Sequence, residues 1–237
     1  GGAKNHLMVL PDAKEDMTAA NVVASMSGCA GQRCMAASAM VGVGKIDHII
    51  EKIVAEAKKV VPGQNLGAVI NKESKERIER YIDEAEKDGA KILVDGRGAI
   101  VKGKENGTYV GPTVIDYVKP EMSVAKEEIF GPVISIMRTN TIDEALEIEN
   151  ANPYGNAASV FTQNGGLARY IIDHASAGMI GVNVGVPVPR EPFSFGGWNE
   201  SKFGVGDITG KSSVEFWTKL KKSTTKWNPE AGVNWMS

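Results

Sequence analysis

The sequence predicts an α/β protein whose sheet is largely parallel and flanked by helices. Short apolar runs alternate along the chain with longer segments in which apolar residues recur at helical spacing. This alternation is typical of strands that are connected by helices, which makes neighbouring strands parallel. The chain has 237 residues, of which 42% are hydrophobic and 24% are charged. It is therefore long enough to bury a hydrophobic core, and its composition is that of a globular protein.

The first half of the chain gives three strands and three helices. We expect strands over 6–10, 39–43 and 91–94, and helices over 12–27, 47–61 and 72–88. Asp12 followed by Glu15 predicts a capping box for the first helix. Apolar residues at helical spacing mark the second helix, and Pro62-Gly63 ends it. The third helix is strongly charged, keeps one apolar face and stops at Gly89.

The second half continues the alternation and ends differently. We expect strands over 114–118, 133–138, 158–162 and 179–184, and helices over 141–150 and 165–175. Residues 187–210 are rich in glycine and proline and are expected to form a loop. The last predicted element is a strand over 214–227. A strand of this length that follows a long loop either closes its own sheet or adds to the sheet of a partner.

Composition excludes several classes of function. The net charge of −2 does not indicate a nucleic-acid or membrane-surface binder, and no apolar run is long enough to span a bilayer. The two cysteines do not make a disulfide framework and indicate a reducing compartment. Their spacing, with the three histidines far away, gives no zinc signature, so no metal is expected.

Cys34 is the candidate nucleophile of the sequence. Gly31 permits an unusual backbone approach, Arg33 places a positive charge beside the thiol, and small residues follow. A thiol with a pKa near 8.5 is only about 3% ionised at pH 7, whereas one with a pKa near 7 is about half ionised. The alternative is that Cys34 is a small buried side chain, which is the usual state of a free cysteine and remains our interpretation of Cys29.

Four stretches of the chain resemble motifs of the aldehyde dehydrogenase superfamily, in the same order and at similar spacing. These are GQRCMAAS (31–38), EIFGP (128–132), GMIGVNV (178–184) and FSFGGWNESKFG (193–204). The resemblance implies that residues 1–200 form the catalytic domain of that fold. It also implies that residues 201–237 form a return segment with an oligomerisation strand. The N-terminal cofactor-binding domain would then be absent from this chain, which begins without methionine.

The resemblance also implies roles for individual residues. Cys34 would be the nucleophile, and its own backbone N–H would help to hold the oxyanion. Glu128 would accept hydrogen bonds from the nicotinamide ribose of NAD, and Phe130 would pack beside the nicotinamide. Phe195 would lie at the mouth of the substrate tunnel. The alternatives are a solvated charge for Glu128, a core aromatic for Phe130 and a packed loop residue for Phe195.

Further residues resemble the CoA-acylating branch of the family, the methylmalonate-semialdehyde dehydrogenases. These are Arg33 directly before the nucleophile, GAKNH (2–6) and NPYGNAASVFT (152–162). The substrate would be methylmalonate or malonate semialdehyde, and Arg33 would bind its carboxylate, which suits a guanidinium group. The Cys34 thioester would pass to coenzyme A, giving propanoyl-CoA or acetyl-CoA.

Other functions remain open from the sequence. A hydrolytic aldehyde dehydrogenase would use the same nucleophile, and a non-catalytic oligomerisation fragment would use only the terminal strand. A cysteine hydrolase is poorly supported, because such enzymes need a histidine base and no motif surrounds His6, His48 or His174. By resemblance the assembly is a homotetramer, located in the bacterial cytoplasm or, in a eukaryote, in the mitochondrial matrix. The chain alone is expected to be inactive or nearly so.

Overall fold

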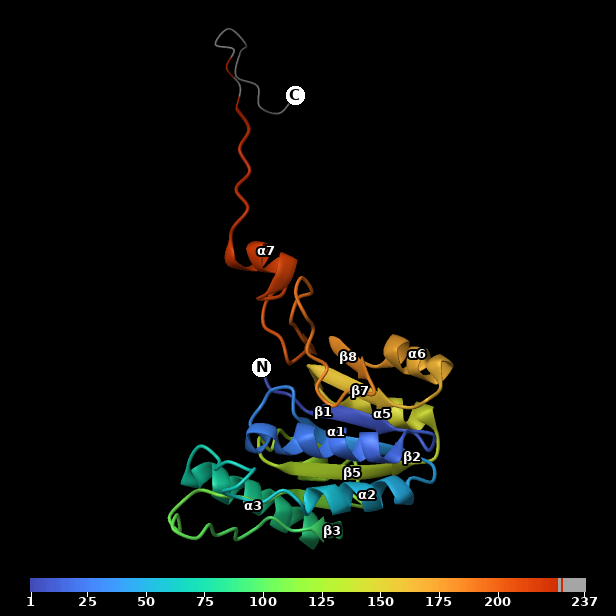
Figure 1. Cartoon of the computed structure of the whole chain (residues 1–237). Coiled ribbons are helices and arrows are strands. Elements are labelled where there is room, and N and C mark those ends of the chain that lie inside the picture. Colours follow the sequence, from blue (N-terminus) through green and yellow to red (C-terminus); the bar gives the residue numbers. More distant parts are fainter. Residues whose placement is uncertain (226, 228–237) are drawn as a thin grey trace.

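The sheet of the protein has seven strands, of which all but one edge strand run parallel. The computed structural model describes residues 1–225 and 227. The strands lie in the order β3 (Lys91–Val94), β4 (Thr113–Asp116), β5 (Val133–Thr139), β2 (Ala37–Val43), β1 (Asn5–Val9), β7 (Ala157–Phe161) and β8 (Met179–Val182) (Figure 1). Within this seven-stranded sheet, only β3 pairs antiparallel to its neighbour, β4. The predicted α/β class and the largely parallel sheet are therefore confirmed.

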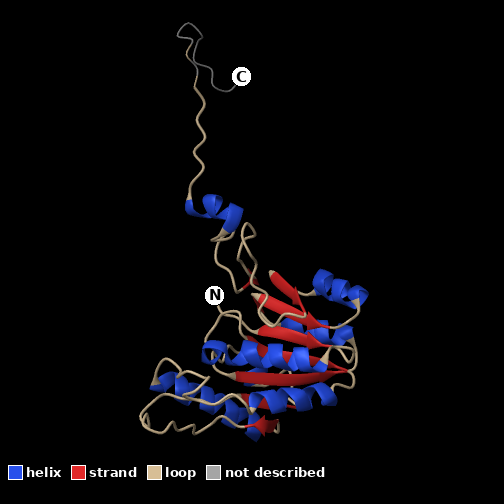
Figure 2. Cartoon of the chain, viewed as in Figure 1, coloured by secondary structure: helices blue, strands red, loops and turns tan. Residues whose placement is uncertain are grey.

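Helices cover both faces of the sheet, as Figure 2 shows. One face packs against α1 (Glu15–Ser27) and α2 (Asp47–Ala57). The other packs against α3 (Lys72–Lys87), α4 (Ser123–Lys126), α5 (Ile142–Ala151) and α6 (Gly165–His174). Each predicted helix of the first 175 residues is present, and α2 ends four residues earlier than predicted.

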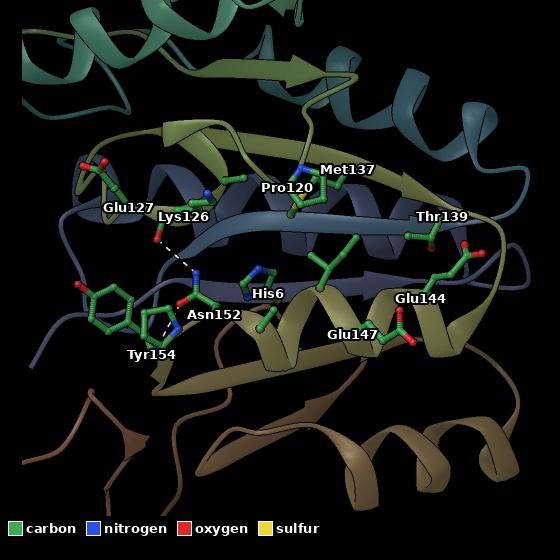
Figure 3. A pocket seen from close by; sticks show the side chains of 14 residues that line it. His6, Pro120, Lys126, Glu127, Met137, Thr139, Glu144, Glu147, Asn152 and Tyr154 are labelled. Atoms are coloured by element: carbon green, nitrogen blue, oxygen red, sulfur yellow. Dashed lines mark hydrogen bonds between the residues drawn. The ribbon is translucent and has the colours of Figure 1, made fainter.

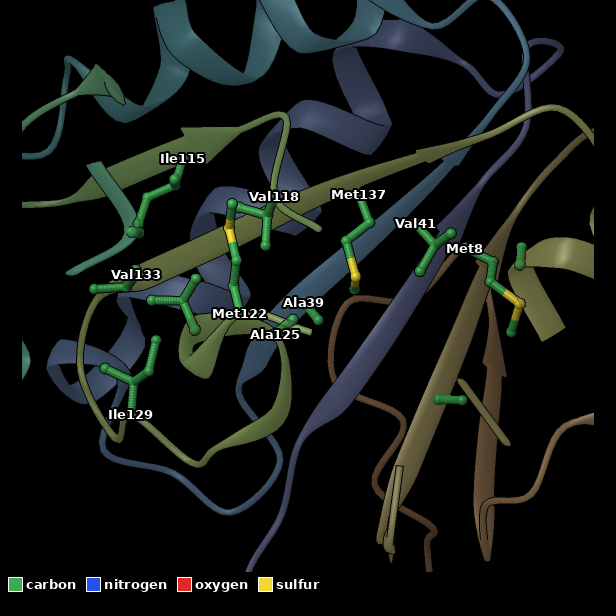
Figure 4. Close-up of a cluster of buried hydrophobic side chains, with 14 of the residues drawn as sticks. Met8, Ala39, Val41, Ile115, Val118, Met122, Ala125, Ile129, Val133 and Met137 are labelled. Atoms are coloured by element: carbon green, nitrogen blue, oxygen red, sulfur yellow. The ribbon is translucent and has the colours of Figure 1, made fainter. Parts of the chain in front are cut away.

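Two hydrophobic cores form because side chains alternate along each buried strand. Strand β1 shows this directly: Leu7 and Val9 join the core under α1 and α2, whereas Met8 joins the core on the opposite face. Figure 4 shows part of that second core, in which Met8, Val41 and Met137 from three neighbouring strands line up. The central strands are thus packed on both faces of the sheet, so residues at their ends are held in defined positions.

Helix caps explain some boundaries and correct one. Thr141 caps α5, and its hydroxyl accepts from the Glu144 N–H while the Glu144 carboxylate accepts from the Thr141 N–H, which is a capping box. The capping box predicted at Asp12 is wrong: α1 begins at Glu15, and no side chain caps it. Asp12 instead accepts from the Thr162 hydroxyl at 2.8 Å and from the Gln163 N–H at 3.0 Å. It therefore joins the end of β7 to the loop after β1.

The strand predicted over 214–227 is wrong in the described residues. Residues Ser213–Trp217 form the short helix α7, residues 218–225 and 227 are in no strand, and residue 226 lies outside the described part. Figure 1 shows this segment leading away from the sheet. A strand exists only where a neighbouring strand pairs with it, and no strand of the described part lies beside this segment. Val214, Trp217 and Leu220 are accordingly exposed.

The loop predicted over 187–210 contains one small element. Its residues Trp198–Asn199 form β9, which pairs antiparallel with β6 (Tyr154–Gly155). The Ser201 hydroxyl also donates to the Gly2 carbonyl at 2.6 Å. These contacts fasten the loop beside the first residues of the chain, close to the start of β1.

Candidate active site

The candidate site lies where the four central strands begin. Strands β5, β2, β1 and β7 are neighbours in that order and run parallel, so their amino ends share one edge of the sheet. Cys34 comes just before β2, and Glu128 and Phe130 come just before β5. Segments 94 residues apart in the sequence are in this way brought side by side.

Cys34 lies in a narrow pocket at this edge. The residues that line it are Ala3, Asn5, Gly31, Arg33, Cys34, Ala36, Ala37, Ser38, Glu128, Phe130 and Gly131. The structure therefore brings together four of the five predicted site residues. Cys34 itself is exposed, so the alternative of a small buried side chain is excluded by the structure. Cys29 is exposed as well, so its interpretation as a small buried side chain is wrong. A nucleophile needs this access to its substrate.

Two buried asparagines hold the Cys34 peptide. The side-chain amides of Asn5 and Asn156 each donate to the Cys34 carbonyl at 2.8 Å. Asn5 also donates to the Ala36 carbonyl at 2.8 Å and accepts from the Ala157 N–H at 3.2 Å. The Cys34 N–H makes no hydrogen bond with any described residue. It is therefore free to donate to a negatively charged oxygen at this point.

The backbone before Cys34 is in an uncommon conformation. Cys29, Ala30 and Gly31 all have left-handed φ values, of 53°, 55° and 70°. Such values are unfavourable for residues other than glycine, and strain of this kind is concentrated at functional sites. Gly31 packs directly on the segment before β5: a Cβ at this position would lie 2.0 Å from the Gly131 carbonyl oxygen. Two loops of the site thus make backbone-to-backbone contact.

Arg33 is half-buried in the pocket and partly engaged. Its Nη2 donates to the Ala24 carbonyl at 3.0 Å and to the Ser25 carbonyl at 2.9 Å. These carbonyls lie at the end of α1, where a cation is favoured by unpaired carbonyl oxygens. The Nε atom is buried and has no partner among the described residues. Gly28 makes room for the guanidinium, because a Cβ there would lie 2.2 Å from Nη2.

Glu128 and Phe130 reach the pocket from the segment before β5. Glu128 is half-buried, and burial raises the pKa of its carboxyl group, while the Ala3 N–H and the Lys4 and Arg77 charges oppose that rise. Phe130 has a left-handed φ of 55°, and 39% of it is exposed. An aromatic ring that is exposed and held in a strained backbone is not a core residue, so the core alternative for Phe130 is excluded by the structure.

Phe195 lies outside this pocket but close to it. Its half-buried ring packs against a small cluster of Met35, Ala157 and Met179. It lines a separate cavity of about 260 Å³ with Asn156. Met35 follows Cys34, and Asn156 donates to the Cys34 carbonyl. Phe195 is therefore connected to the Cys34 loop through these two residues and does not line the Cys34 pocket.

A much larger cavity, of about 660 Å³, lies on the α5 side of the sheet, and Figure 3 shows it around His6. Cys34 does not line it, and it adjoins the candidate site through two pairs of neighbouring residues, His6 beside Asn5 and Glu127 beside Glu128. Burial lowers the pKa of His6 to about 4, so this histidine is neutral near pH 7. No cysteine is among the described residues that line this cavity, so it is not the place for the chemistry of a thiol.

Three residues of the site were not singled out by sequence reasoning. Asn5 and Asn156 lie in stretches that were quoted only for their resemblance, and Lys4 precedes Asn5 in one of them. The signal that could have found them is the start of a predicted strand: polar residues there are unusual in strands that are buried on both faces. Among the described residues no group of histidine, cysteine and acidic side chains could hold a metal ion. No helix of this part is long and apolar enough to cross a membrane.

Comparison with known proteins places this geometry in one class. The profile of the aldehyde dehydrogenase family matches residues 1–223. The chain therefore belongs to the aldehyde dehydrogenase family, and its predicted resemblance is confirmed.

The relatives include named semialdehyde dehydrogenases. The rat mitochondrial methylmalonate-semialdehyde/malonate-semialdehyde dehydrogenase (acylating) is 46% identical over 97% of this chain and 44% of its own length. Malonate-semialdehyde dehydrogenase 2 of Geobacillus kaustophilus is 43% identical over 95% of this chain and 48% of its own. The chain thus spans somewhat less than half the length of these curated relatives.

Solved structures agree with this placement. The crystal structure of methylmalonate-semialdehyde dehydrogenase from Oceanimonas doudoroffii has a TM-score of 0.91 and 41% identity, covering 96% of this chain and 48% of that one. Betaine aldehyde dehydrogenase from Staphylococcus aureus, solved in complex with NAD⁺, has a TM-score of 0.84 and 28% identity, covering 91% of this chain and 44% of that one. The predicted fold is therefore that of the family.

Proposed function

We propose that this chain carries the catalytic part of an NAD-dependent, CoA-acylating dehydrogenase of methylmalonate or malonate semialdehyde. The observation that carries the proposal is the pocket shared by Cys34, Arg33, Glu128 and Phe130. It is supported by the two named semialdehyde dehydrogenases that are 43% and 46% identical to nearly all of the chain. Residues 1–200 would form the catalytic domain, and residues beyond this chain would supply a cofactor-binding domain.

In the proposed mechanism the Cys34 thiolate attacks the aldehyde carbon. A C–S bond forms, and the carbonyl π electrons move to the oxygen, giving a thiohemiacetal. The free Cys34 N–H can donate to this oxygen. Asn5 and Asn156 hold the Cys34 peptide so that thiol and N–H face the same pocket. Loss of hydride from the former aldehyde carbon then leaves an acyl thioester on Cys34.

NAD fits the residues at one wall of this pocket. When bound, NAD supplies the hydride acceptor. The Glu128 carboxylate can accept two hydroxyl hydrogens of a ribose, and the exposed Phe130 ring offers a face for a flat heterocycle. Gly131, which follows them, contacts Gly31 of the Cys34 loop. This contact fixes the distance between the cofactor wall and the thiol.

Arg33 gives the proposal its substrate class. A guanidinium beside the thiol suits an aldehyde that carries a carboxylate. Its Nη2 is occupied by the end of α1, but Nε is buried and unpaired among the described residues. Leaving such a donor unpaired in a buried place is costly, about 1–3 kcal/mol, so a substrate oxygen is a favourable partner. The acyl group would pass from Cys34 to the thiol of coenzyme A, which releases Cys34 as a thiol, and the carboxylate would leave as CO2 or bicarbonate while a proton takes its place on the carbon.

The test is NADH formation by the longest native form of the protein, given methylmalonate or malonate semialdehyde, with and without coenzyme A. We expect strong dependence on coenzyme A, loss of turnover in Cys34→Ala and an increased KM in Arg33→Ala. Cys29→Ala is the matched control, because this second exposed cysteine lies outside the pocket and its loss leaves turnover intact. Turnover that is independent of coenzyme A would instead favour the hydrolytic branch of the family.

We also propose that the protein assembles as a homo-oligomer, a tetramer by resemblance. Exposed apolar residues support this proposal, because isolated chains seldom leave many together. In the return segment they include Phe203 at 78%, Val205 at 92%, Trp217 at 70% and Leu220 at 84% exposure.

The rat relative is named mitochondrial and another relative is bacterial. We propose the cytoplasm of a bacterium or the matrix of a mitochondrion as the location.

A further inference from the structure

Lys4 is a buried lysine that the proposed chemistry does not use. It lies directly before β1, and only 2% of it is exposed. Its ammonium group donates to the Ser38 hydroxyl at 2.8 Å. Within the described residues this is its one hydrogen bond, and it makes no salt bridge. Lysine is almost never fully buried without a charged partner, because burial of an ammonium group is costly. Its position therefore needs a reason.

Charged groups surround Lys4 on several elements. Glu127 and Glu128 face it from the segment before β5, and His6 follows it on β1. From α3, Tyr81 donates to the Glu127 carboxylate and Arg77 donates to the Glu128 carbonyl at 3.5 Å. Glu127 is thus engaged by Tyr81. Glu128 has no side-chain hydrogen-bond partner among the described residues, and its ionised form is favoured by the Ala3 N–H and then by the charge of Lys4.

Lys4 and Glu128 each offset the cost of burying the other. Burial lowers the pKa of Lys4 to about 7, and the charges of Glu128 and then Glu127 oppose this. Burial raises the pKa of Glu128, and the Ala3 N–H and then Lys4 oppose that rise. Ser38 connects the pair to the thiol, because it holds Lys4 and also lines the Cys34 pocket.

We infer that Lys4, anchored on Ser38, is a positioning residue that keeps the Glu128 carboxylate ionised and therefore able to bind a ribose. The inference rests on the proposed role of Glu128 in holding NAD. A carboxylate can accept two hydroxyl hydrogens only while it is ionised, since a protonated carboxyl group must itself donate. Partial burial disfavours the ionised form of the Glu128 carboxyl group, and the nearby Lys4 cation favours it.

The sign of the pH dependence follows from the two groups. Between the raised pKa of Glu128 and about pH 7, both side chains are charged and attract each other. As the pH falls through the pKa of Glu128, this carboxylate is protonated and NAD affinity falls. Without the Lys4 charge, that protonation occurs at a higher pH. Above about pH 7, Lys4 has lost most of its charge in the native protein, so removing it changes little there.

The experiment is a calorimetric titration of NAD into the longest native form of the protein between pH 5 and pH 8. We compare Lys4→Met, Lys4→Arg and Lys126→Met, the last as a control because Lys126 is an exposed lysine two residues before Glu128. We expect Lys4→Met to bind NAD several-fold more weakly than the native protein at the acid end of this range and within about twofold at pH 8, because loss of the Lys4 charge raises the pKa of Glu128 further. Lys4→Arg keeps the charge and restores the native pH profile.

Two results separate failure of this inference from failure of the proposed function. If Glu128→Gln binds NAD as tightly as the native protein, Glu128 is not the ribose ligand and the proposed function loses that part. If Glu128→Gln weakens binding but Lys4→Met has the native pH profile, the inference about Lys4 is overturned. Ser38→Ala guards against a folding defect in Lys4→Met, because it keeps the lysine and removes only its anchor. It is expected to shift the profile in the same direction.

Discussion

At the scale of single residues, the conformation of the Cys34 loop depends on a glycine. Gly31 has a φ of 70°, and its backbone touches that of Gly131. A residue with a Cβ adopts this φ only at a cost in free energy, and its Cβ would not fit against Gly131. The contact joins the loop that carries the thiol to the loop that carries Glu128 and Phe130. We therefore expect Gly31 to fix the position of the Cys34 loop relative to the loop that carries Glu128 and Phe130.

Gly31→Ala tests this view. The left-handed φ alone costs an alanine about 1–2 kcal/mol, and the added Cβ would also press on the Gly131 carbonyl oxygen. We expect a larger loss of unfolding free energy, together with a slower reaction of Cys34 with iodoacetamide. Gly98→Ala is the matched control, since Gly98 has a φ of 66° but no atom within 4 Å of an added Cβ. Equal losses in the two variants would contradict the role of the contact.

His6 gives a prediction about acid stability. Burial lowers its pKa to about 4 from an unfolded value of 6.5, so the unfolded chain binds the proton more tightly than the native one. The stabilisation is therefore complete above pH 6.5 and is lost as the pH falls towards 4, by about 3 kcal/mol in total. Urea unfolding of His6→Gln between pH 4 and pH 7 is expected to lack this part of the decline. His48→Gln, on the exposed face of α2, provides the comparison.

At the scale of elements, the cap of α5 holds one wall of the His6 cavity. Thr141→Ala removes the hydroxyl that accepts from the Glu144 N–H at 3.2 Å and leaves that donor without its partner. We expect a loss of about 1 kcal/mol of unfolding free energy, measured by urea denaturation. Thr141→Ser keeps the oxygen and is expected to restore most of the loss. A full loss in the serine variant would show that the methyl group, and not the cap, stabilises α5.

Most elements could be predicted because their signals are local. Apolar runs gave the strands, and helical spacing with caps or glycine stops gave the helices, usually to within two residues. The capping box predicted at Asp12 was wrong because an acidic residue near the start of a helix can equally accept a hydrogen bond from another loop, here from Thr162. The left-handed turns at Cys29, Ala30 and Phe130 could not be predicted, since contacts between distant loops impose them.

The site was predictable only in part for the same reason. Resemblance supplied Cys34, Arg33, Glu128 and Phe130, and the strand order explains why they meet. Asn5 and Asn156 stand out locally only as polar residues at the start of strands, and their hydrogen bonds, across 29 and 122 residues, depend on the fold. Lys4 is important because it is buried, and burial at the start of a strand depends on the whole sheet.

At the scale of the whole molecule, the exposed apolar residues of the return segment (201–237) indicate that the chain associates with other copies of itself. Val214 and Leu220 are 67% and 84% exposed, on a segment that extends away from the sheet (Figure 1). We expect Leu220→Asp to lower the molar mass of the longest native form, measured by light scattering, because it places a charge on an apolar contact surface. Lys221→Asp alters the charge of the neighbouring position and is expected to leave the mass unchanged. An unchanged mass in Leu220→Asp would exclude this segment from the interface.

The central claim is that Cys34 carries the acyl group during turnover. It is tested most directly by mass spectrometry of peptides from the longest native form, quenched with acid after reaction with NAD and malonate semialdehyde in the absence of coenzyme A. We expect an acyl group on the peptide that contains Cys34, in place of a free thiol there, and its disappearance when coenzyme A is added before the quench. An acyl group found only on Cys29, or on no cysteine at all, would contradict the account.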